Sequence, residues 1–370
     1  MDTNRQGTKE HPSLNRKLFV TLFIFIVLLQ LILSIVFGIS KKGFHIDEYF
    51  SYSLSNSADT LYLPVQRNEW NETAKFMDTF AVMPESAKDA FNYTRVFESN
   101  AQDVHPPLYY ILLHSICSMS QGIFSKWQGI SLNIFFMLLC LCLVALITYN
   151  ITGNRSLVLA VSLIFALNPG TYTSTIFVRM YAMLSMFVLL AVYLHLSAIT
   201  ENGIPFHIFL PCCMLCCFLG FMTQYYFIIF MAFISCAFVV FLLCKRKFKR
   251  VAAYIASLLA ALYATYLFYP AWVQHIFGGY RGIGAAESFM NRSDGIYKIR
   301  AFINDMSVSL FSHCTYFLVG VLVLLVITAT ILYRKQLHGN FLFHGLKNNP
   351  AYLKWLFLLF VSVGSFLVIA

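Results

Sequence analysis

The sequence predicts an all-α, polytopic membrane protein. Of its 370 residues, 59% are hydrophobic and only 11% are charged, whereas soluble domains carry about 25% charged residues. Apolar segments recur along the whole chain, and about nine are candidates to cross the roughly 30 Å hydrocarbon layer as helices. They occupy residues 18–38, 129–149, 156–170, 183–199, 205–222, 225–244, 251–270, 314–333 and 351–370.

The first apolar segment follows a basic N-terminus, residues 1–17, which we expect in the cytoplasm because cytoplasmic loops carry an excess of Lys and Arg. Residues 18–38 exceed the apolar part of a signal peptide and lack an A-x-A cleavage pattern, so we expect a retained helix. Residues 18–370 then form a single transmembrane domain. Because Ala370 falls within an apolar run, the question whether a C-terminal part is missing stays open.

A further apolar stretch, residues 105–124, decides the topology. If it does not cross, the basic run 245–250 follows six crossings and lies on the same side as the N-terminus. The positive-inside rule therefore favours a helix that does not span. Its polar residues recur at helical spacing, as expected of a helix lying at the membrane interface. They are Tyr110, His114, Ser118 and Gln121.

This topology creates a long first extracytoplasmic loop, residues 40–128, with juxtamembrane helices, and a later one at 271–313. The first loop holds ten of the sixteen acidic residues, and loops of this length are usually functional. Between Val104 and Ala286 the only acidic residue is Glu201. This scarcity counts against an ion-coupled transporter, which generally places carboxylates inside its helices.

Composition also limits the other classes of function. The net charge of +10 does not indicate nucleic-acid binding, because much of it lies in the short run 245–250 between apolar segments. The ten cysteines lie within or beside apolar segments, so we expect neither a disulfide framework nor a metal site among them.

Four polar clusters fall in the regions expected outside the cytoplasm, and each alone has an ordinary explanation. Paired acids are often solvated, proline suits the first turn of a helix, and tyrosines form belts at membrane edges. Arg179 is different, because a cation near a helix N-terminus opposes the helix dipole and calls for an anionic partner. The clusters span residues 45–49, 103–110, 179–181 and 223–226.

Together, HIDEYFSY, DVHPPLYYILLH, NPGTYTSTIFVRMYAML and TQYYFIIFM resemble, in this order, the GT-C class of integral-membrane glycosyltransferases. The resemblance covers residues 15–245 and is closest to the branch of protein O-mannosyltransferases and the lipid A aminoarabinose transferase. It implies a GT-C-type helical bundle, a polyprenyl- or dolichyl-phosphate sugar donor used at the outer face, and Asp47 as catalytic base. Gln224 stands where many relatives have histidine, and the C-terminal domain of larger relatives is absent, which leaves the acceptor unsupported.

The residues fit this chemistry independently of the resemblance. A carboxylate within hydrogen-bond reach can take the proton of an acceptor hydroxyl, a role we assign to Asp47, with Glu48 as its modulator or a second acceptor contact. Arg179 can hold the phosphate leaving group bidentately. The other residues expected at the donor site are His105, Tyr109, Tyr181, Gln224 and Tyr225.

We expect no essential metal, since Arg179 already offers a charge for the phosphate. A divalent cation stays open as an alternative, because four outward residues could converge on one. They are His45, Asp47, Glu48 and His105.

The expected partners are a polyprenyl-phosphate-linked sugar donor, the lipid bilayer and an acceptor that is a protein, lipid or polysaccharide. The expected location is a bacterial plasma membrane, with the site facing outward. One alternative is a lipid-linked saccharide flippase or exporter without transferase activity. Another is a membrane scaffold whose large loop binds a partner, and it predicts that Asp47, His105 and Arg179 lie far apart.

Overall fold

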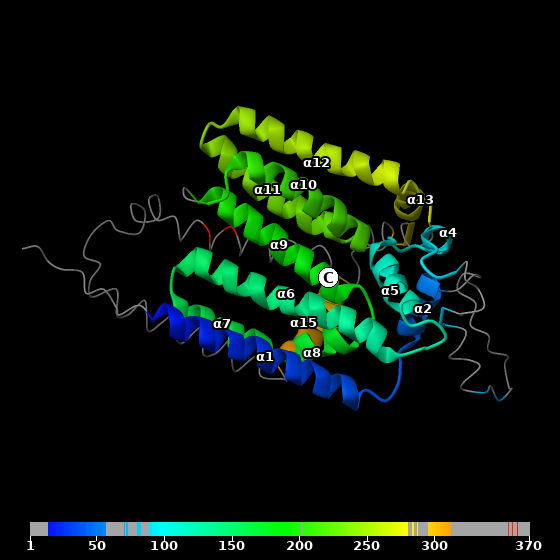
Figure 1. Cartoon of the computed structure of the whole chain (residues 1–370). Helices are drawn as coiled ribbons and strands as arrows, with labels where there is room; N and C mark the ends of the chain where they lie inside the picture. Colours follow the sequence, from blue (N-terminus) through cyan, green and yellow to red (C-terminus); the bar gives the residue numbers. More distant parts are fainter. Residues whose placement is uncertain are drawn as a thin grey trace, which may run out of the picture.

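The computed structural model of the chain is a bundle of helices (Figure 1). It describes residues 14–56, 70, 72, 80–82, 89–200, 203–279, 283–284, 287, 295–311, 354, 357 and 361. Six helices in this part of the chain are long and apolar enough to cross a membrane. They are α1 (Arg16–Ser40), α6 (Lys126–Thr152), α9 (Tyr181–Ile199), α10 (Phe206–Thr223), α11 (Phe227–Cys244) and α12 (Phe248–Phe268).

A bent pair of helices supplies a seventh span if it is counted as one. α7 (Arg155–Leu167) and α8 (Pro169–Ile176) meet at an angle of 51°. The break falls at Asn168, whose side chain accepts a hydrogen bond from the N–H of Gly170, and proline follows because its ring suits the first turn of a new helix. The apolar segment expected at 156–170 is therefore bent near its end, and a helix continues to Ile176.

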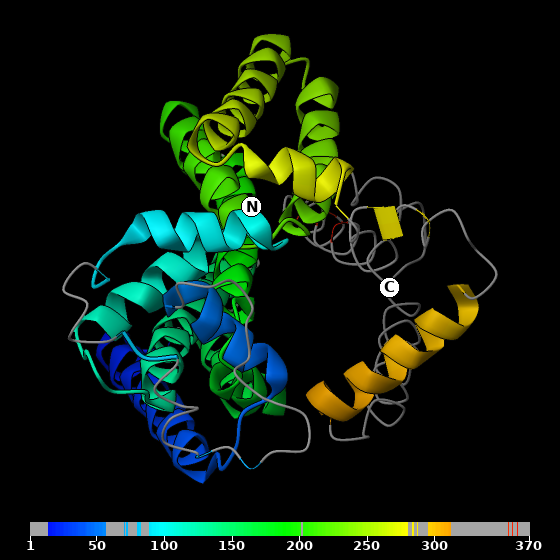
Figure 2. The same ribbon diagram turned by 90° about the vertical axis from the view of Figure 1, so that its right-hand side faces the viewer.

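The connections between helices sort to the two ends of the bundle. The start of α1 and the turns α6–α7, α9–α10 and α11–α12 lie at one end, here called the basic end because it holds residues 245–250 (Figure 1). The opposite end, the loop end, is seen face on in Figure 2. It carries the short helices α2 (Ile46–Asn56), α4 (Tyr93–Gln102), α5 (Leu108–Ser118) and α13 (Ala271–Phe277).

Residues 105–124 contain only a short apolar helix, which agrees with the expectation that this stretch does not cross. Helix α5 has 11 residues, a length of about 16 Å, and the chain leaves it at the loop end to start α6 (Figure 1). The run 245–250 therefore shares an end with the start of α1, as the charge pattern required.

Three of the four residues of the predicted polar stripe face the protein, so the stripe does not mark a membrane-interface helix, while Gln121, beyond the end of α5, is exposed. Tyr110, His114 and Ser118 are buried. Nδ1 of His114 donates to Oδ1 of Asn56 over 3.1 Å, and Oγ of Ser118 accepts the N–H of Phe91 over 3.0 Å. Helical spacing alone cannot show whether a polar stripe meets water or polar groups of neighbouring helices.

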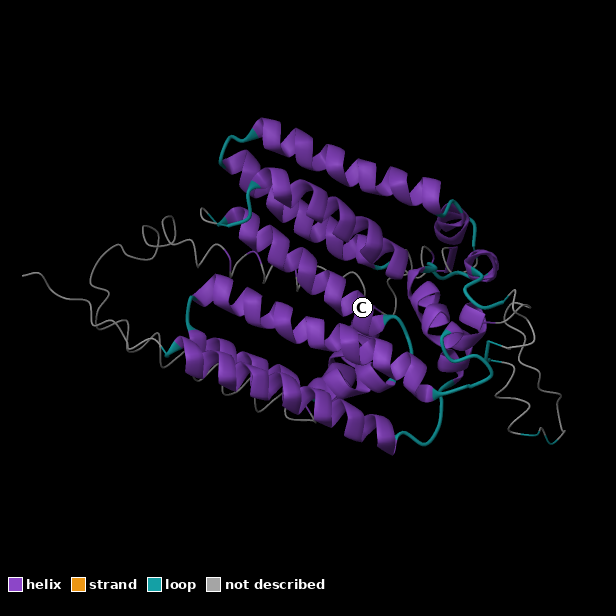
Figure 3. Cartoon of the chain, in the orientation of Figure 1, coloured by secondary structure: helices purple, strands orange, loops and turns teal. Residues whose placement is uncertain are grey.

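The described residues form helices and no strand (Figure 3), and the long apolar ones fit an integral, multi-pass membrane protein. The expected total of about nine spans stays a prediction. Segments 314–333 and 351–370 lie outside the described residues, apart from Lys354, Phe357 and Val361. Residues 1–13 and much of the 40–128 loop also lie outside them, while the 271–313 loop contains α13 and α15 (Gly295–Phe311).

Helix α6 lies at the centre of the bundle, and Gly129 near its start allows a close contact. Cβ built at Gly129 would lie 2.1 Å from Cγ1 of Val178 in the segment before α9. The N–H of Gly129 also donates to the hydroxyl of Tyr52, over 3.2 Å, which ties α2 to α6. A glycine is needed here because any side chain would push these segments apart.

We expect Gly129→Ala to lower the free energy of unfolding by about 1–3 kcal/mol, because extra atoms in a filled contact force their neighbours to move. Thermal unfolding of the purified protein in detergent measures this change. Gly284→Ala is the control, since Cβ there meets no atom within 4 Å. Equal stability of the two variants would contradict the packing argument.

Candidate active site

The acidic pair at the start of α2 occupies two different environments. Glu48 is 1% exposed, and its two carboxylate oxygens accept hydrogen bonds from Nζ of Lys41 over 2.7 and 2.8 Å. The same carboxylate accepts the N–H of His45 over 2.7 Å and the N–H of Val178 over 2.8 Å. The side chain of Asp47, in contrast, is 41% exposed.

Glu48 is therefore a positioning residue. Its partners come from the end of α1, the start of α2 and the segment before α9, which it holds together. The two acids also suit the first turn of α2, where the helix dipole favours negative charge. Asp47 is left as the accessible carboxylate of the pair.

Arg179 lies buried behind the backbone of Asp47. Its NH2 is 3.0 Å from Nε2 of His105. Its NH1 makes longer contacts of 3.3, 3.5 and 3.4 Å to the carbonyl of Asp47 and the hydroxyls of Ser51 and Tyr110. Its Nε has no hydrogen-bond partner among the described residues, so this guanidinium has donor capacity left.

The charge of Arg179 is maintained by its surroundings. Burial by itself lowers the pKa of Arg179, but Tyr110, Tyr181 and Asp47 outweigh burial and raise the pKa above its ordinary value. Because an arginine is protonated at every physiological pH, the site holds a permanent cation next to Asp47.

Asp103 completes a chain of buried polar groups with His105 and Arg179. A guanidinium can only donate, so Nε2 of His105 accepts from Arg179 and the ring proton lies on Nδ1. That proton is donated to the carboxylate of Asp103. Sequence reasoning did not assign Asp103 to the site, although its place two residues before His105 in DVHPP was the available signal.

A pocket of about 490 Å³ opens beside this network, between the start of α2, helix α8 and the start of α9. Phe177 and Tyr181 form a stacked wall with ring centroids 6.1 Å apart. His45 also lines the pocket, with its ring 5.6 Å from that of Phe177, and its Nδ1 lies 3.6 Å from Oδ2 of Asp47. Asp47 is not itself a lining residue, but its carboxylate lies next to His45. Other lining groups include Lys41, Thr173 and Ser174.

Arg179 is 5% exposed and does not line this pocket. In the present geometry it supports Asp47 and His105 from behind. Lys41 is a second cation, and it lines the pocket while it pairs with Glu48. Tyr181, predicted at the site, does line the pocket, as expected.

Tyr109 does not shape the pocket as expected, because it is fully buried. Burial raises its pKa well above the ordinary value, and the protonated hydroxyl donates to Oδ1 of Asn133 over 3.1 Å. The amide of Asn133 donates in turn to the carbonyls of Thr175 and Phe177. Tyr109 therefore supports the pocket wall indirectly.

Tyr225 and Gln224 lie at the loop end but do not line the pocket. Burial raises the pKa of Tyr225, and its hydroxyl donates to Nδ1 of His275 over 2.8 Å, while Nε2 of His275 donates to the carbonyl of Ala101 over 3.0 Å. These bonds join the α10–α11 turn, α13 and the end of α4. Oε1 of Gln224 accepts the N–H of Tyr225, which is a local contact.

The four residues considered as metal ligands do not converge. Glu48 is engaged by Lys41, and His105 is held between Asp103 and Arg179. Within the described ranges, no three His, Cys, Asp or Glu side chains are placed to hold a metal ion together. Whether activity needs a metal stays a prediction.

No protein-family model, curated protein or solved structure matches the chain. Its class is therefore defined by its own geometry, which is a helical bundle suited to a membrane with a polar site at one end. The resemblance to GT-C enzymes rests on the four motifs and stays a prediction.

We expect Glu48→Gln to lower the free energy of unfolding by about 3–5 kcal/mol, because it leaves the buried ammonium of Lys41 unpaired. The variant Glu98→Gln, at an exposed position of α4, is the control and should unfold as the unaltered protein does. Thermal unfolding in detergent measures both. Adding Lys41→Met to Glu48→Gln should restore part of the loss, and a neutral effect of Glu48→Gln alone would contradict the buried ion pair.

Proposed function

We propose that the protein is an inverting glycosyltransferase that moves a sugar from a polyprenyl-phosphate or dolichyl-phosphate donor to an acceptor hydroxyl. The observation that carries the proposal is the convergence of Asp47, His105 and Arg179 next to a pocket at the loop end. These residues come from three separated parts of the chain, which Asp103 and Glu48 hold in place.

In the proposed reaction, the Asp47 carboxylate accepts the proton of the acceptor hydroxyl. The acceptor oxygen forms a bond to the anomeric carbon as the bond from that carbon to the phosphate oxygen breaks. The lipid phosphate leaves with the electron pair, and the configuration at the anomeric carbon inverts. The exposure of Asp47 and its place beside a lining residue of the pocket fit a general base, which must come within hydrogen-bond reach of the hydroxyl.

The leaving phosphate needs positive charge and hydrogen-bond donors. Lys41 lines the pocket, and Arg179 adds a fixed cation behind it, with Nε as a donor that has no partner among the described residues. Movement of the 177–180 segment would bring the planar guanidinium to the phosphate oxygens, which it fits bidentately. The stacked rings of Phe177 and Tyr181 offer an apolar face for the sugar ring.

The proposed orientation follows from the separation of charge between the two ends of the bundle. The site lies at the loop end, and the basic run 245–250 lies at the other (Figure 1). Cytoplasmic loops carry the excess of Lys and Arg, so the site is proposed to face away from the cytoplasm, at a bacterial plasma membrane.

The two alternatives fare differently. A scaffold predicts that the side chains of Asp47, His105 and Arg179 lie far apart. The guanidinium of Arg179 contacts the ring of His105 and the backbone carbonyl of Asp47, which counts against a scaffold for His105 and Arg179. A flippase or exporter shares the membrane helices and basic residues, so only a measurement of sugar transfer separates it from an enzyme.

We expect Asp47→Asn to reduce sugar transfer by about 10²- to 10⁴-fold, because an amide cannot accept the hydroxyl proton. The assay supplies proteoliposomes with a panel of radiolabelled polyprenyl-phosphate sugars and measures label passed to an extract of membrane acceptors. The side chain of Asp47 is partly exposed and makes no buried ion pair, so the variant should unfold at nearly the same temperature as the unaltered protein.

The control for this assay is Glu72→Gln, which neutralises an exposed carboxylate of the same loop and should leave transfer unchanged. Normal transfer by Asp47→Asn would remove Asp47 from the mechanism. If the unaltered protein moves labelled lipid across the bilayer without transferring the sugar, the flippase alternative replaces the enzyme.

A further inference from the structure

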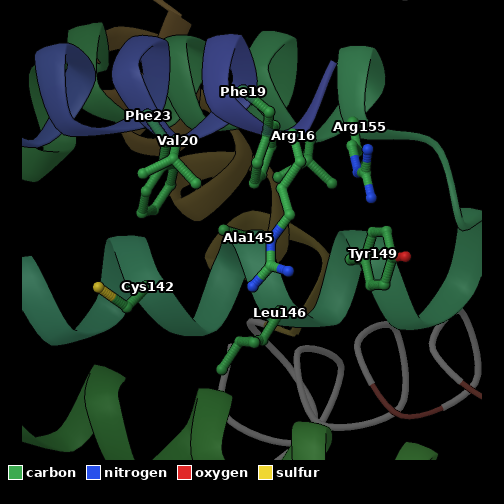
Figure 4. Close-up of a pocket in the computed structure, with 10 residues that line it drawn as sticks. Arg16, Phe19, Val20, Phe23, Cys142, Ala145, Leu146, Tyr149 and Arg155 are labelled. Atoms are coloured by element: carbon green, nitrogen blue, oxygen red, sulfur yellow. The ribbon is translucent and has the colours of Figure 1, made fainter. Parts of the chain in front are cut away.

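A second groove lies at the basic end, between α1, α6 and α7, and it has no part in the proposed reaction. It encloses about 470 Å³. Apolar side chains of α1 and α6 line it, among them Phe19, Phe23 and Leu146, and two arginines stand in it, Arg16 and Arg155 (Figure 4).

Both arginines lie at positions where the local structure does not stabilise a positive charge. Arg16 is the first residue of α1 and Arg155 the first residue of α7, and the positive end of a helix dipole disfavours another positive charge. Neither forms an ion pair with any described residue. One nitrogen of Arg155 donates to the carbonyl of Leu14 over 2.8 Å, which leaves its other donors for a partner.

The two side chains point toward α6 from neighbouring helices. Figure 4 shows Arg16 reaching across the groove to Ala145 and Leu146, with Arg155 beside Tyr149. Two guanidinium groups and two helix N-termini at one place make a region that favours an anion. A phosphate suits it best, since a guanidinium binds phosphate oxygens bidentately.

The groove opens toward the lipid rather than toward the interior of the bundle. Val20 is 46% exposed, Leu146 46% and Tyr149 48%, and all three belong to helices that are apolar enough to span a membrane. A tyrosine near the end of such a helix is typical of the membrane–water interface. The occupant therefore combines an anionic group at the interface with an apolar chain below it.

We propose that this groove binds an anionic phospholipid of the leaflet at the basic end. Its phosphate lies between Arg16 and Arg155, and one acyl chain follows Phe19, Phe23 and Leu146. Free phosphate would meet the same charges but would leave the apolar wall uncovered, so the whole lipid is the better occupant. Basic pockets between membrane helices on the cytoplasmic side are suited to anionic headgroups.

The bound lipid would hold α1 against α7 at the end opposite the candidate site. The lipid site is connected to the candidate site through two helices. Helix α1 leads to Lys41, and α7 continues into α8, which lines the pocket. The proposal does not depend on the sugar-transfer reaction, and it can be tested without any activity measurement.

The test is native mass spectrometry of the full chain in detergent, titrated with phosphatidylglycerol or phosphatidylcholine of identical acyl chains. We expect phosphatidylglycerol to bind about 30-fold more tightly, as two arginines that each attract an anionic lipid would produce. The double variant Arg16→Gln/Arg155→Gln should lose this preference. Leu146→Trp, which fills the groove without changing charge, should weaken binding of both lipids.

The matched control is Lys245→Gln/Lys249→Gln, which removes two exposed charges from the same end but outside the groove. It should keep the preference for phosphatidylglycerol. Equal binding of the two lipids by the unaltered protein would overturn the proposal. The proposal would also be overturned if the control lost the preference for phosphatidylglycerol as fully as Arg16→Gln/Arg155→Gln does. Binding of glycerol 3-phosphate as tight as that of phosphatidylglycerol would show a plain anion site and would also overturn it. If Arg16→Gln/Arg155→Gln does not fold, unchanged lipid binding by Leu146→Trp overturns the proposal.

Discussion

A buried carboxylate holds the loop end of this protein together. Glu48 accepts hydrogen bonds from Lys41, from the backbone of His45 just before its helix, and from Val178, which lies 130 residues further along the chain. A buried charge is costly unless it is fully paired, so these partners cannot separate independently. Since Asp47 precedes Glu48 and Arg179 follows Val178, the same bonds bring the exposed acid and the buried cation together.

The membrane helices provide a scaffold for this end of the bundle. The described acids Asp47, Glu48 and Asp103 lie at the loop end. Cations lie at both ends, with Lys41 and Arg179 at the loop end and Arg16 and Arg155 at the other. Polar groups inside the bundle mostly satisfy one another, as Tyr109 and Asn133 do. The candidate site thus lies at one end, while the opposite end presents the cations of the groove beside α1.

Much of the architecture could be predicted because hydropathy and charge act locally. Seven apolar segments correspond to described helices, and the failure of residues 105–124 to cross followed from counting crossings to the run 245–250. The expectation that Asp47 and Arg179 lie at the same end agrees with the contact of Arg179 with the backbone of Asp47, while their roles stay predictions. The roles of Tyr109 and of the α5 stripe were not predictable, because a buried polar residue and an exposed one have the same spacing in a helix.

Composition and pattern were thus enough for the class of fold, the topology of the described part and the residues that carry charge near the site. Packing alone gave the two adjacent acids different roles. Glu48 forms a buried ion pair, and Asp47 is left as an accessible carboxylate. Packing also showed that Asp103 contacts His105, which contacts Arg179. The physical reason is distance along the chain. Hydropathy is a property of a segment, whereas burial and hydrogen bonding also depend on distant residues, such as Val178, which is 130 positions from Glu48.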